Sequence, residues 1–180
     1  MKDSLEFLDD FRPGFEATIR ARVPDESLAA IDDALPTDWI PGPHTRAVID
    51  AVVEELGRDE APTLWRELVS RKMIRSPLIR GLVQTVSALG GQSPKTLLKA
   101  LPRGWRNAYR DFGRPKIVSS NRGEMDLVFE GVPAYLFHYR QHWVAIEGVL
   151  LGLVKTGGGE GRVSLRFEPE ERSVYALVTW

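Results

Sequence analysis

The sequence predicts an α+β fold, in which an N-terminal helical bundle and one long helix pack against a small C-terminal antiparallel sheet. Three observations predict it. Apolar residues recur at helical spacing through the first 113 residues, interrupted by Pro and Gly. Residues 124–130 and 162–168 alternate polar and apolar side chains, as strands do. Between these two strands, residues 134–156 keep a continuous helical stripe.

The organisation of the chain follows from these patterns. We expect one domain over residues 1–180, mainly helical in 1–113, followed in 114–180 by strand, strand, long helix and β-hairpin. The 180 residues are 43% hydrophobic and 27% charged, as in an ordinary globular protein. A chain of this length buries roughly two-thirds of its unfolded surface, so its core needs no disulfide.

Capping and breaking residues mark the helices of the first quarter. Asp25 suits the N-cap of a helix through Leu35. Residues 39–43, which include two prolines, predict a rigid loop. From Thr45 the apolar positions predict another helix, with Gly57 as the residue that ends it.

The next helices are marked in the same way. Asp59 is expected to cap a helix that extends to residue 73. Ser76-Pro77 and Ser93-Pro94 each place Ser at an N-cap and Pro at the first helical position, which predicts two helix starts. A separate short helix is expected over residues 105–112.

The strands are predicted by short alternating runs between turn residues. Residues 116–120 predict a short strand, which a turn at 121–123 joins to the strand 124–130. Glycines 157–159 end the long helix. The strand 162–168 and a closing strand over 173–180 are expected to form an antiparallel hairpin.

Composition excludes several classes of function. The net charge is −1, with 24 basic and 25 acidic residues, whereas a nucleic-acid binder usually carries a basic excess. The absence of cysteine excludes disulfides and thiolate chemistry and fits a reducing compartment. The N-terminus is too acidic for a signal peptide. The apolar run at 143–154 is broken by Glu147 and too short to span a bilayer. We therefore expect a cytoplasmic protein with no nucleic-acid partner and no membrane span.

His138 and His142 are the strongest candidates for metal binding. They lie four residues apart on the predicted long helix, so their imidazoles would share one face. However, Tyr139 stands where a zinc protease has its Glu, and Glu147, the nearest further carboxylate, lies on another face. The alternative interpretation is a partly exposed polar face, which we favour.

Other candidate motifs have simpler explanations. His44 follows Pro43 at a helix start and suits capping or solvent contact. The glycine-rich residues 157–161 follow a helix and precede a strand, the reverse of a phosphate-binding loop. Of the five tryptophans, Trp39 and Trp105 are the candidates for a pocket wall or contact surface. We therefore assign no catalytic, cofactor-binding or metal-binding residue, expect no cofactor, and expect that the chain is not an enzyme.

The order of elements resembles that of the heme nitric-oxide/oxygen-binding domains. Residues 145–156 resemble the long helix of that family, and residues 63–70 resemble an earlier helix. The same superfamily includes the 4-vinyl-reductase-type domains and the TRAPP trafficking subunits. The resemblance implies a heme-NO-binding-like fold.

A second resemblance extends over nearly the whole chain. Trp39-Ile40-Pro41, Ser93-Pro94, residues 105–113 and the pair Gly148 and Gly152 are similar to an uncharacterised bacterial family that is expanded in myxobacteria. These motifs are structural in type. They therefore support the fold more than a function.

The residues that hold heme in the first family are missing. Its iron ligand is a His on a mid-chain helix, but residues 76–112 contain no His. Its Tyr-x-Ser-x-Arg motif binds the heme propionates. Here Ser120 and Arg122 match the end of that motif, but they precede the strand, and Val118 holds the Tyr position. The resemblance therefore implies the fold without ordinary heme binding.

Two functions from different classes remain. The first is a non-catalytic signalling or scaffold module that acts through protein–protein contacts, with a homodimer left open. The second is a binding domain for a small lipophilic or aromatic ligand in a cavity between helices and sheet, since relatives in the superfamily hold heme or an acyl chain there.

Overall fold

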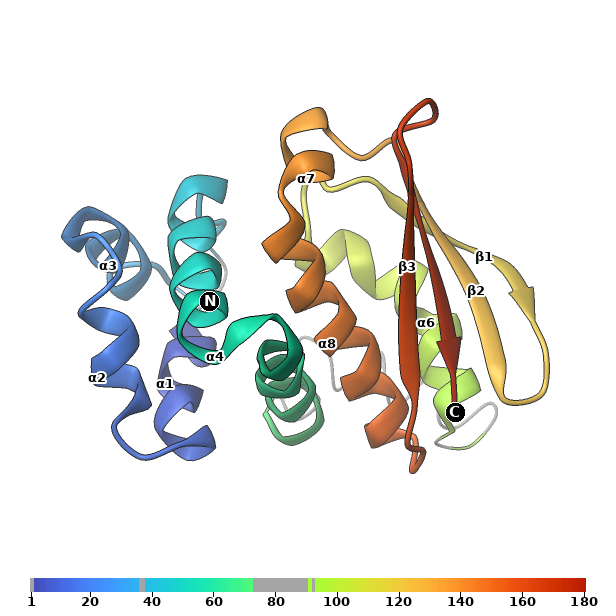
Figure 1. The fold of residues 1–180 in the computed structure, drawn as a ribbon, viewed down its shortest axis with the longest axis horizontal. Helices are drawn as coiled ribbons and strands as arrows, with labels where there is room; N and C mark the ends of the chain where they lie inside the picture. Colours follow the sequence, from blue (N-terminus) through green and yellow to red (C-terminus); the bar gives the residue numbers. More distant parts are fainter. Residues whose placement is uncertain (1, 36–37, 73–90, 92) are drawn as a thin grey trace.

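A computed structural model describes residues 2–35, 38–72, 91 and 93–180. Figure 1 shows the helices and strands, which follow one another as α1 (Lys2–Phe11), α2 (Phe15–Arg20), α3 (Asp25–Asp32), α4 (Gly42–Arg71), α6 (Pro94–Ala108), β1 (Arg114–Ser120), β2 (Glu124–Glu130), α7 (Ala134–His138), α8 (Arg140–Thr156), β3 (Arg162–Glu168) and β4 (Ser173–Thr179).

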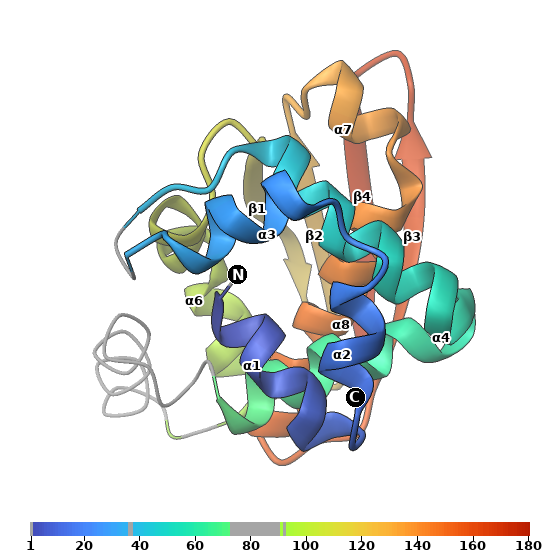
Figure 2. The same cartoon turned by 90° about the vertical axis from the view of Figure 1, so that its left-hand side faces the viewer.

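The molecule is layered. Four antiparallel strands form one sheet in the order β1-β2-β4-β3, so β1 and β3 are its edges. Figure 1 shows α8 and α6 against one face of this sheet, α4 beside α8, and α1–α3 outermost. Turned so that α1–α3 face the viewer, Figure 2 places the sheet at the back. The predicted α+β fold, with a helical N-terminal part and a small C-terminal antiparallel sheet, is confirmed.

Helix α4 bends sharply at Gly57. This residue has φ 77° and ψ 164°, so the helical path is interrupted there although residues on both sides are helical. Glycine reaches positive φ without a steric penalty. The two predicted helices separated by Gly57 are therefore confirmed, and Figure 1 shows their change of direction. In contrast, α3 ends at Asp32, three residues before the expected Leu35, and begins directly after Pro24.

Helix α6 confirms one prediction and corrects another. The Ser93 hydroxyl accepts a hydrogen bond from the Thr96 backbone N–H at 3.2 Å, as expected of an N-cap. The separate helix expected over residues 105–112 is wrong, because α6 continues through Trp105 and ends at Ala108. Buried Leu98, Leu101 and Trp105 lie on one helical face, and this packing outweighs the cost of the internal Pro102. The helix start predicted at Ser76-Pro77 lies outside the described residues.

The expected helix over residues 134–156 is divided in two. Tyr139, with φ −85° and ψ 85°, separates α7 from α8. Its hydroxyl donates a hydrogen bond to Asp50 Oδ1 of α4 at 2.8 Å, and its ring lies beneath the Arg46 guanidinium. These contacts hold the side chain against α4, and the backbone leaves the helical path to permit them.

The strands follow the predicted pattern. β2 and β3 have the expected bounds, and β3 and β4 form the predicted antiparallel hairpin. β1 pairs with β2 through an irregularity between Ile117 and Ser119, which is typical of a β-bulge. Alternate residues of β2 and β4 are almost fully buried beneath the helices: Met125, Leu127, Phe129, Val174, Ala176 and Val178.

Helices α4 and α8 make the most extensive contact between helices. A Cβ atom added at Gly152 would lie 2.5 Å from the Cβ of Val69, and one added at Gly148 would lie 2.7 Å from the Cβ of Trp65. Both distances are far below van der Waals contact. The two glycines of α8 therefore allow the helices to approach more closely than any other residue would.

An ion cluster holds the same helix pair at its solvent side. Lys155 of α8 donates to both carboxylate oxygens of Glu67 on α4, at 2.7 and 2.9 Å. Arg71 and Arg66 lie 3.0 and 3.2 Å from the same carboxylate. Burial alone would raise the pKa of Glu67, but the hydrogen bond from Lys155 and the three positive charges outweigh it and lower the pKa.

We predict that Gly152→Ala destabilises the protein by about 1–3 kcal/mol, because its methyl group overlaps Val69 at the helix crossing. This steric cost exceeds the gain of up to about 1 kcal/mol that Ala brings to a helix interior. Thermal and urea denaturation measure the change. Gly42→Ala is the matched control, since a Cβ there meets no atom within 4 Å. Equal stability of Gly152→Ala and the wild type would contradict the close approach.

Candidate functional site: an aromatic cluster between helices and sheet

Packed aromatic rings fill the space between α6, α8 and the inner face of the sheet. Trp105 stacks on Tyr109 with ring centroids 4.1 Å apart. It also lies 5.3 Å from Phe112 and 5.1 Å from Phe129 of β2. The ring of Trp143 on α8 packs against the same residues, with its centroid 5.5 Å from that of Phe112 and 5.4 Å from that of Phe129. These five residues, with His142, are called the aromatic cluster below.

The packing continues toward β3. Trp143 and Phe137 each meet the ring of Phe167 edge-on, at 5.8 and 5.7 Å. The Arg140 guanidinium lies over the Phe167 ring, 3.5 Å from the ring centroid. The indole N–H of Trp143 donates to the Leu136 carbonyl at 3.0 Å, so this ring is fixed as well as packed. Aromatic pairs at these separations contribute beyond the area they bury.

Two nitrogen atoms of the aromatic cluster have no hydrogen-bond partner. Trp105 Nε1 and His142 Nε2 are both buried, and neither meets an acceptor or donor among the described residues. Burial lowers the pKa of His142 to about 4 and raises the pKa of Tyr109 to about 12. His142 and Tyr109 are therefore both neutral at pH 7. Burying Trp105 Nε1 and His142 Nε2 without hydrogen bonds costs free energy of folding.

His138 and His142 do not form a shared face, which corrects the expected arrangement. The break at Tyr139 separates them, so His138 is exposed at the end of α7 and His142 is buried in α8. Glu147 lies 3.5 Å from Arg58 instead. Across the described part of the chain, no three His, Asp or Glu side chains gather as a metal site would require.

His44 joins two helices. Its Nδ1 lies 3.0 Å from the Ser27 hydroxyl, which links the first turn of α4 to α3. Ser27 is buried. The pair therefore contributes to the packing of α3 against α4.

The two tryptophans singled out in the sequence have different surroundings. Trp105 is buried at the centre of the aromatic cluster, whereas Trp39 is 41% exposed and lies beneath the guanidinium of Arg110 at 4.3 Å. The cluster itself was not predicted. Trp105, Tyr109 and Phe112 stand at i, i+4 and i+7 in the sequence, but α6 ends at Ala108, so it is the chain after the helix that brings Tyr109 and Phe112 to Trp105.

The residues that match the propionate motif do not converge. Val118 projects to solvent with 58% exposure at the irregularity of β1. The Ser120 hydroxyl is buried and has no partner among the described residues, while Arg122 is exposed in the following turn. Side chains that face in different directions cannot clamp one carboxylate.

The outer face of the sheet carries a shallow hollow of about 480 Å³. The Arg166 guanidinium lies over the Tyr175 ring at 4.3 Å, and Leu177 is 39% exposed beside it. No helix covers this face in Figure 1. The lining residues come from all four strands: Val118, Asp126, Ser164, Leu165, Arg166, Tyr175 and Leu177.

The arrangement of helices and sheet is that of the H-NOX proteins. An H-NOX protein from K. algicida, solved as Fe(II) unliganded, covers 98% of this chain and 92% of its own at 13% identity, with a TM-score of 0.61. An H-NOX protein from S. oneidensis in the Fe(II)NO ligation state covers 99% and 98% at 11% identity, with a TM-score of 0.54. The predicted likeness to this fold is confirmed.

A more distant match extends over part of the fold. The trafficking protein particle complex subunit 3 of Naegleria fowleri, covalently bound to palmitic acid, covers 75% of this chain and 92% of its own at 12% identity, with a TM-score of 0.43, too low to carry an argument. No protein-family model and no curated protein matches the sequence. None of the described helices has the length and apolar character needed to cross a membrane.

We predict that His142 makes the protein less stable in acid. Because burial holds its pKa near 4 in the folded state against 6.5 when unfolded, the unfolded state binds the proton first. Stability is therefore fully present above pH 6.5 and falls as the pH drops toward 4, by about 3 kcal/mol in total. Urea denaturation between pH 4 and 7 measures this slope.

The variant His142→Phe is expected to have a flatter stability profile over that interval, whatever its absolute stability. His138→Gln is the control, because His138 is exposed. Identical slopes for His142→Phe and the wild type would show that His142 titrates normally in the folded protein.

Proposed function

We propose that the chain is a non-catalytic module that acts through contacts with other proteins and does not bind heme. The observation that carries this proposal is the aromatic cluster. Trp105, Phe112 and Trp143 occupy the space between α6, α8 and the sheet with rings in direct contact. Because aromatic rings occupy this interior, we expect the domain to bind its partners at its surface.

The described residues around the aromatic cluster do not suit a heme. Helix α6 contains no His. The imidazole of His142, which belongs to the aromatic cluster, has the Phe112 ring 4.5 Å away and the Tyr109 and Tyr139 rings 6.4 and 6.0 Å away. A porphyrin at His142 Nε2 would have to displace these rings. Haem proteins hold their iron through an axial side chain in an open pocket, and this packing argues against one here.

The surface supports a contact function. Val118 and Leu177 place exposed apolar atoms on the uncovered face of the sheet, and Tyr175 and Arg166 lie beside them. Tyr and Arg side chains around an apolar centre are enriched at protein interfaces.

We predict that added hemin produces no sharp absorbance band near the blue end of the visible spectrum and no rise in melting temperature. The physical reason is the ring packing around His142, which leaves its Nε2 without access to iron. An absorbance titration and a thermal scan of the same samples measure both effects. A sharp band accompanied by thermal stabilisation would overturn the proposal that the module acts without heme.

One observation favours a second function, a binding site for a small aromatic or lipophilic molecule. Trp105 Nε1 and His142 Nε2 are buried and have no partner among the described residues. A ligand with polar atoms at both ends of an aromatic body would satisfy them. Such a ligand would have to separate rings that are now in contact.

For this second function we predict that native mass spectrometry of freshly purified protein shows a bound mass, and that Trp105→Phe loses it because the indole donor is gone. Gly42→Ala, which changes an open surface position, should retain it. A bare polypeptide mass for the wild type would exclude the ligand and leave the contact module.

A further inference from the structure

Charge is unevenly distributed along the chain although the net charge is only −1. Residues 1–60 contain fifteen acidic and six basic residues. Residues 94–122, which include α6 and β1, contain one acidic residue, Asp111. They contain eight basic residues: Lys95, Lys99, Arg103, Arg106, Arg110, Arg114, Lys116 and Arg122.

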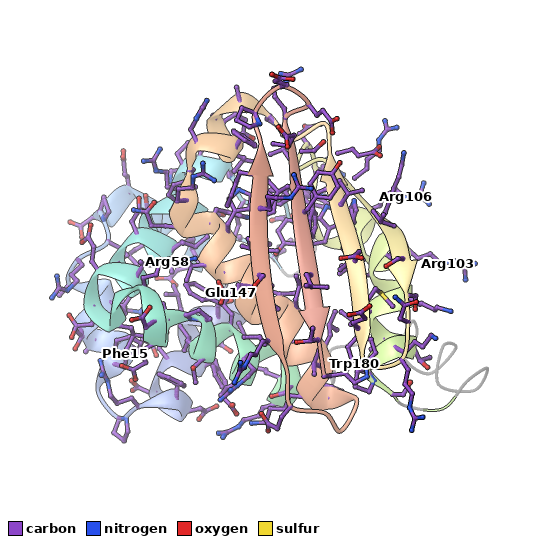
Figure 3. All side chains as sticks on the ribbon, turned by 45° about the vertical axis from the view of Figure 1, so that its right-hand side comes forward. Phe15, Arg58, Arg103, Arg106, Glu147 and Trp180 are labelled. Carbon is purple, nitrogen blue, oxygen red and sulfur yellow. The ribbon has the colours of Figure 1, made fainter. Side chains whose placement is uncertain are left out.

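Four of these basic residues form a narrow stripe along α6. At about 100° per residue, Lys95, Lys99, Arg103 and Arg106 lie within a sector of about 80°. The rise of about 1.5 Å per residue spreads them over about 16 Å. The buried side of the helix lies opposite, and Figure 3 shows Arg103 and Arg106 projecting outward from the molecule. We call these four residues the basic stripe.

The basic stripe has no ion-pair partner in the part of the chain that the structure describes. None of the ion pairs among the described residues includes a member of it. Residues 73–90, whose structure is not described, contain no Asp or Glu in the sequence. Four like charges aligned on one helix face repel one another, and a bound anion would reduce this repulsion.

An aromatic side chain lies near the end of the stripe. Arg110 follows α6 and places its guanidinium over Trp39 at 4.3 Å. Trp39 is 41% exposed, and Leu35 is also exposed on the same connecting segment. Trp and Arg carry much of the binding energy in protein interfaces, which makes this pair a suitable anchor beside a row of charges.

We infer that the basic stripe, together with Trp39 and Arg110, is a docking surface for an acidic protein segment whose carboxylates lie on one face. This inference rests on the proposed contact function and names the chemistry of the partner. A helix with Glu at every fourth residue repeats at about 6 Å, which matches the spacing of Lys95, Lys99 and Arg103. The arrangement gives complementary charges along one line.

The geometry favours a protein over a lipid surface or a nucleic acid. The outward sector of α6 presents charges without exposed apolar side chains, whereas a membrane-bound helix inserts an apolar face. The stripe is one residue wide and the chain as a whole is slightly acidic, whereas nucleic-acid binding needs a broad basic excess.

Two helical peptides of equal composition test the inference. One carries its Glu residues on a single face at i, i+4, i+8 and i+12, and its isomer distributes the same Glu residues around the helix. We expect the one-face peptide to bind at least about fivefold more tightly, with binding that weakens between 50 and 300 mM NaCl because exposed charges are screened. Fluorescence anisotropy of labelled peptide measures both affinities.

The variant Lys99→Glu with Arg103→Glu is expected to weaken binding of the one-face peptide by about tenfold or more, since two attractive contacts become repulsive. Its matched control is Arg162→Glu with Arg172→Glu, which changes the net charge equally on β3, at the far edge of the sheet, and in the turn that follows β3. We expect less than about a twofold effect there. All four side chains are exposed, and melting curves check that both variants fold.

Several results would overturn the inference. Equal affinity for the two peptide isomers, or an equal loss in both variants, would show attraction by charge alone. Binding to vesicles of phosphatidylserine or to a DNA duplex without binding to the peptide would assign the stripe to another class of partner. Self-association that the Lys99→Glu, Arg103→Glu variant abolishes would assign it to a second copy. The hemin titration is independent of all these results, so either proposal can fail alone.

Discussion

The close approach of α4 and α8 is the constraint on which the other contacts depend. Because Gly148 and Gly152 carry no side chain, α8 lies directly against Trp65 and Val69, and this fixes the distance from the helical layers to the sheet. The Lys155–Glu67 ion pair joins the same two helices. The aromatic rings beyond α8 fit only at that separation, since protein interiors are close-packed and tolerate little displacement.

The helical periodicity and capping residues were sufficient to predict most of the fold. Gly57, Ser93 and the alternating strands act locally, so their effects are visible in the sequence. The break at Tyr139 was not predicted within the expected helix 134–156. Its side chain is held by a hydrogen bond to Asp50, 89 residues earlier in the chain, and a local pattern does not indicate such a contact. Likewise, the expected helix at 105–112 depended on local breakers, whereas burial of Trp105 keeps α6 continuous past Pro102.

The aromatic cluster could be predicted only in part. The spacing of Trp105, Tyr109 and Phe112 places three aromatic residues close together in the chain, although α6 ends before Tyr109. Their partners Phe129 and Trp143 come from a strand and another helix, and no short-range pattern indicates that pairing. The same long-range packing explains His142. Its spacing from His138 suggested a shared face, but burial in the cluster gives it an apolar environment and a lowered pKa.

The separation of charge makes the α1–α3 side of the molecule acidic and the α6 side basic. The acidic residues of α1–α3 lie on one side of the α4–α8 layer, and the basic stripe of α6 lies on the other side (Figure 1). In the field of a charged partner, such a molecule turns before contact, so fewer encounters occur in the wrong orientation. Orientation would then affect the association rate more than the lifetime of a complex, and this advantage diminishes as ionic strength rises.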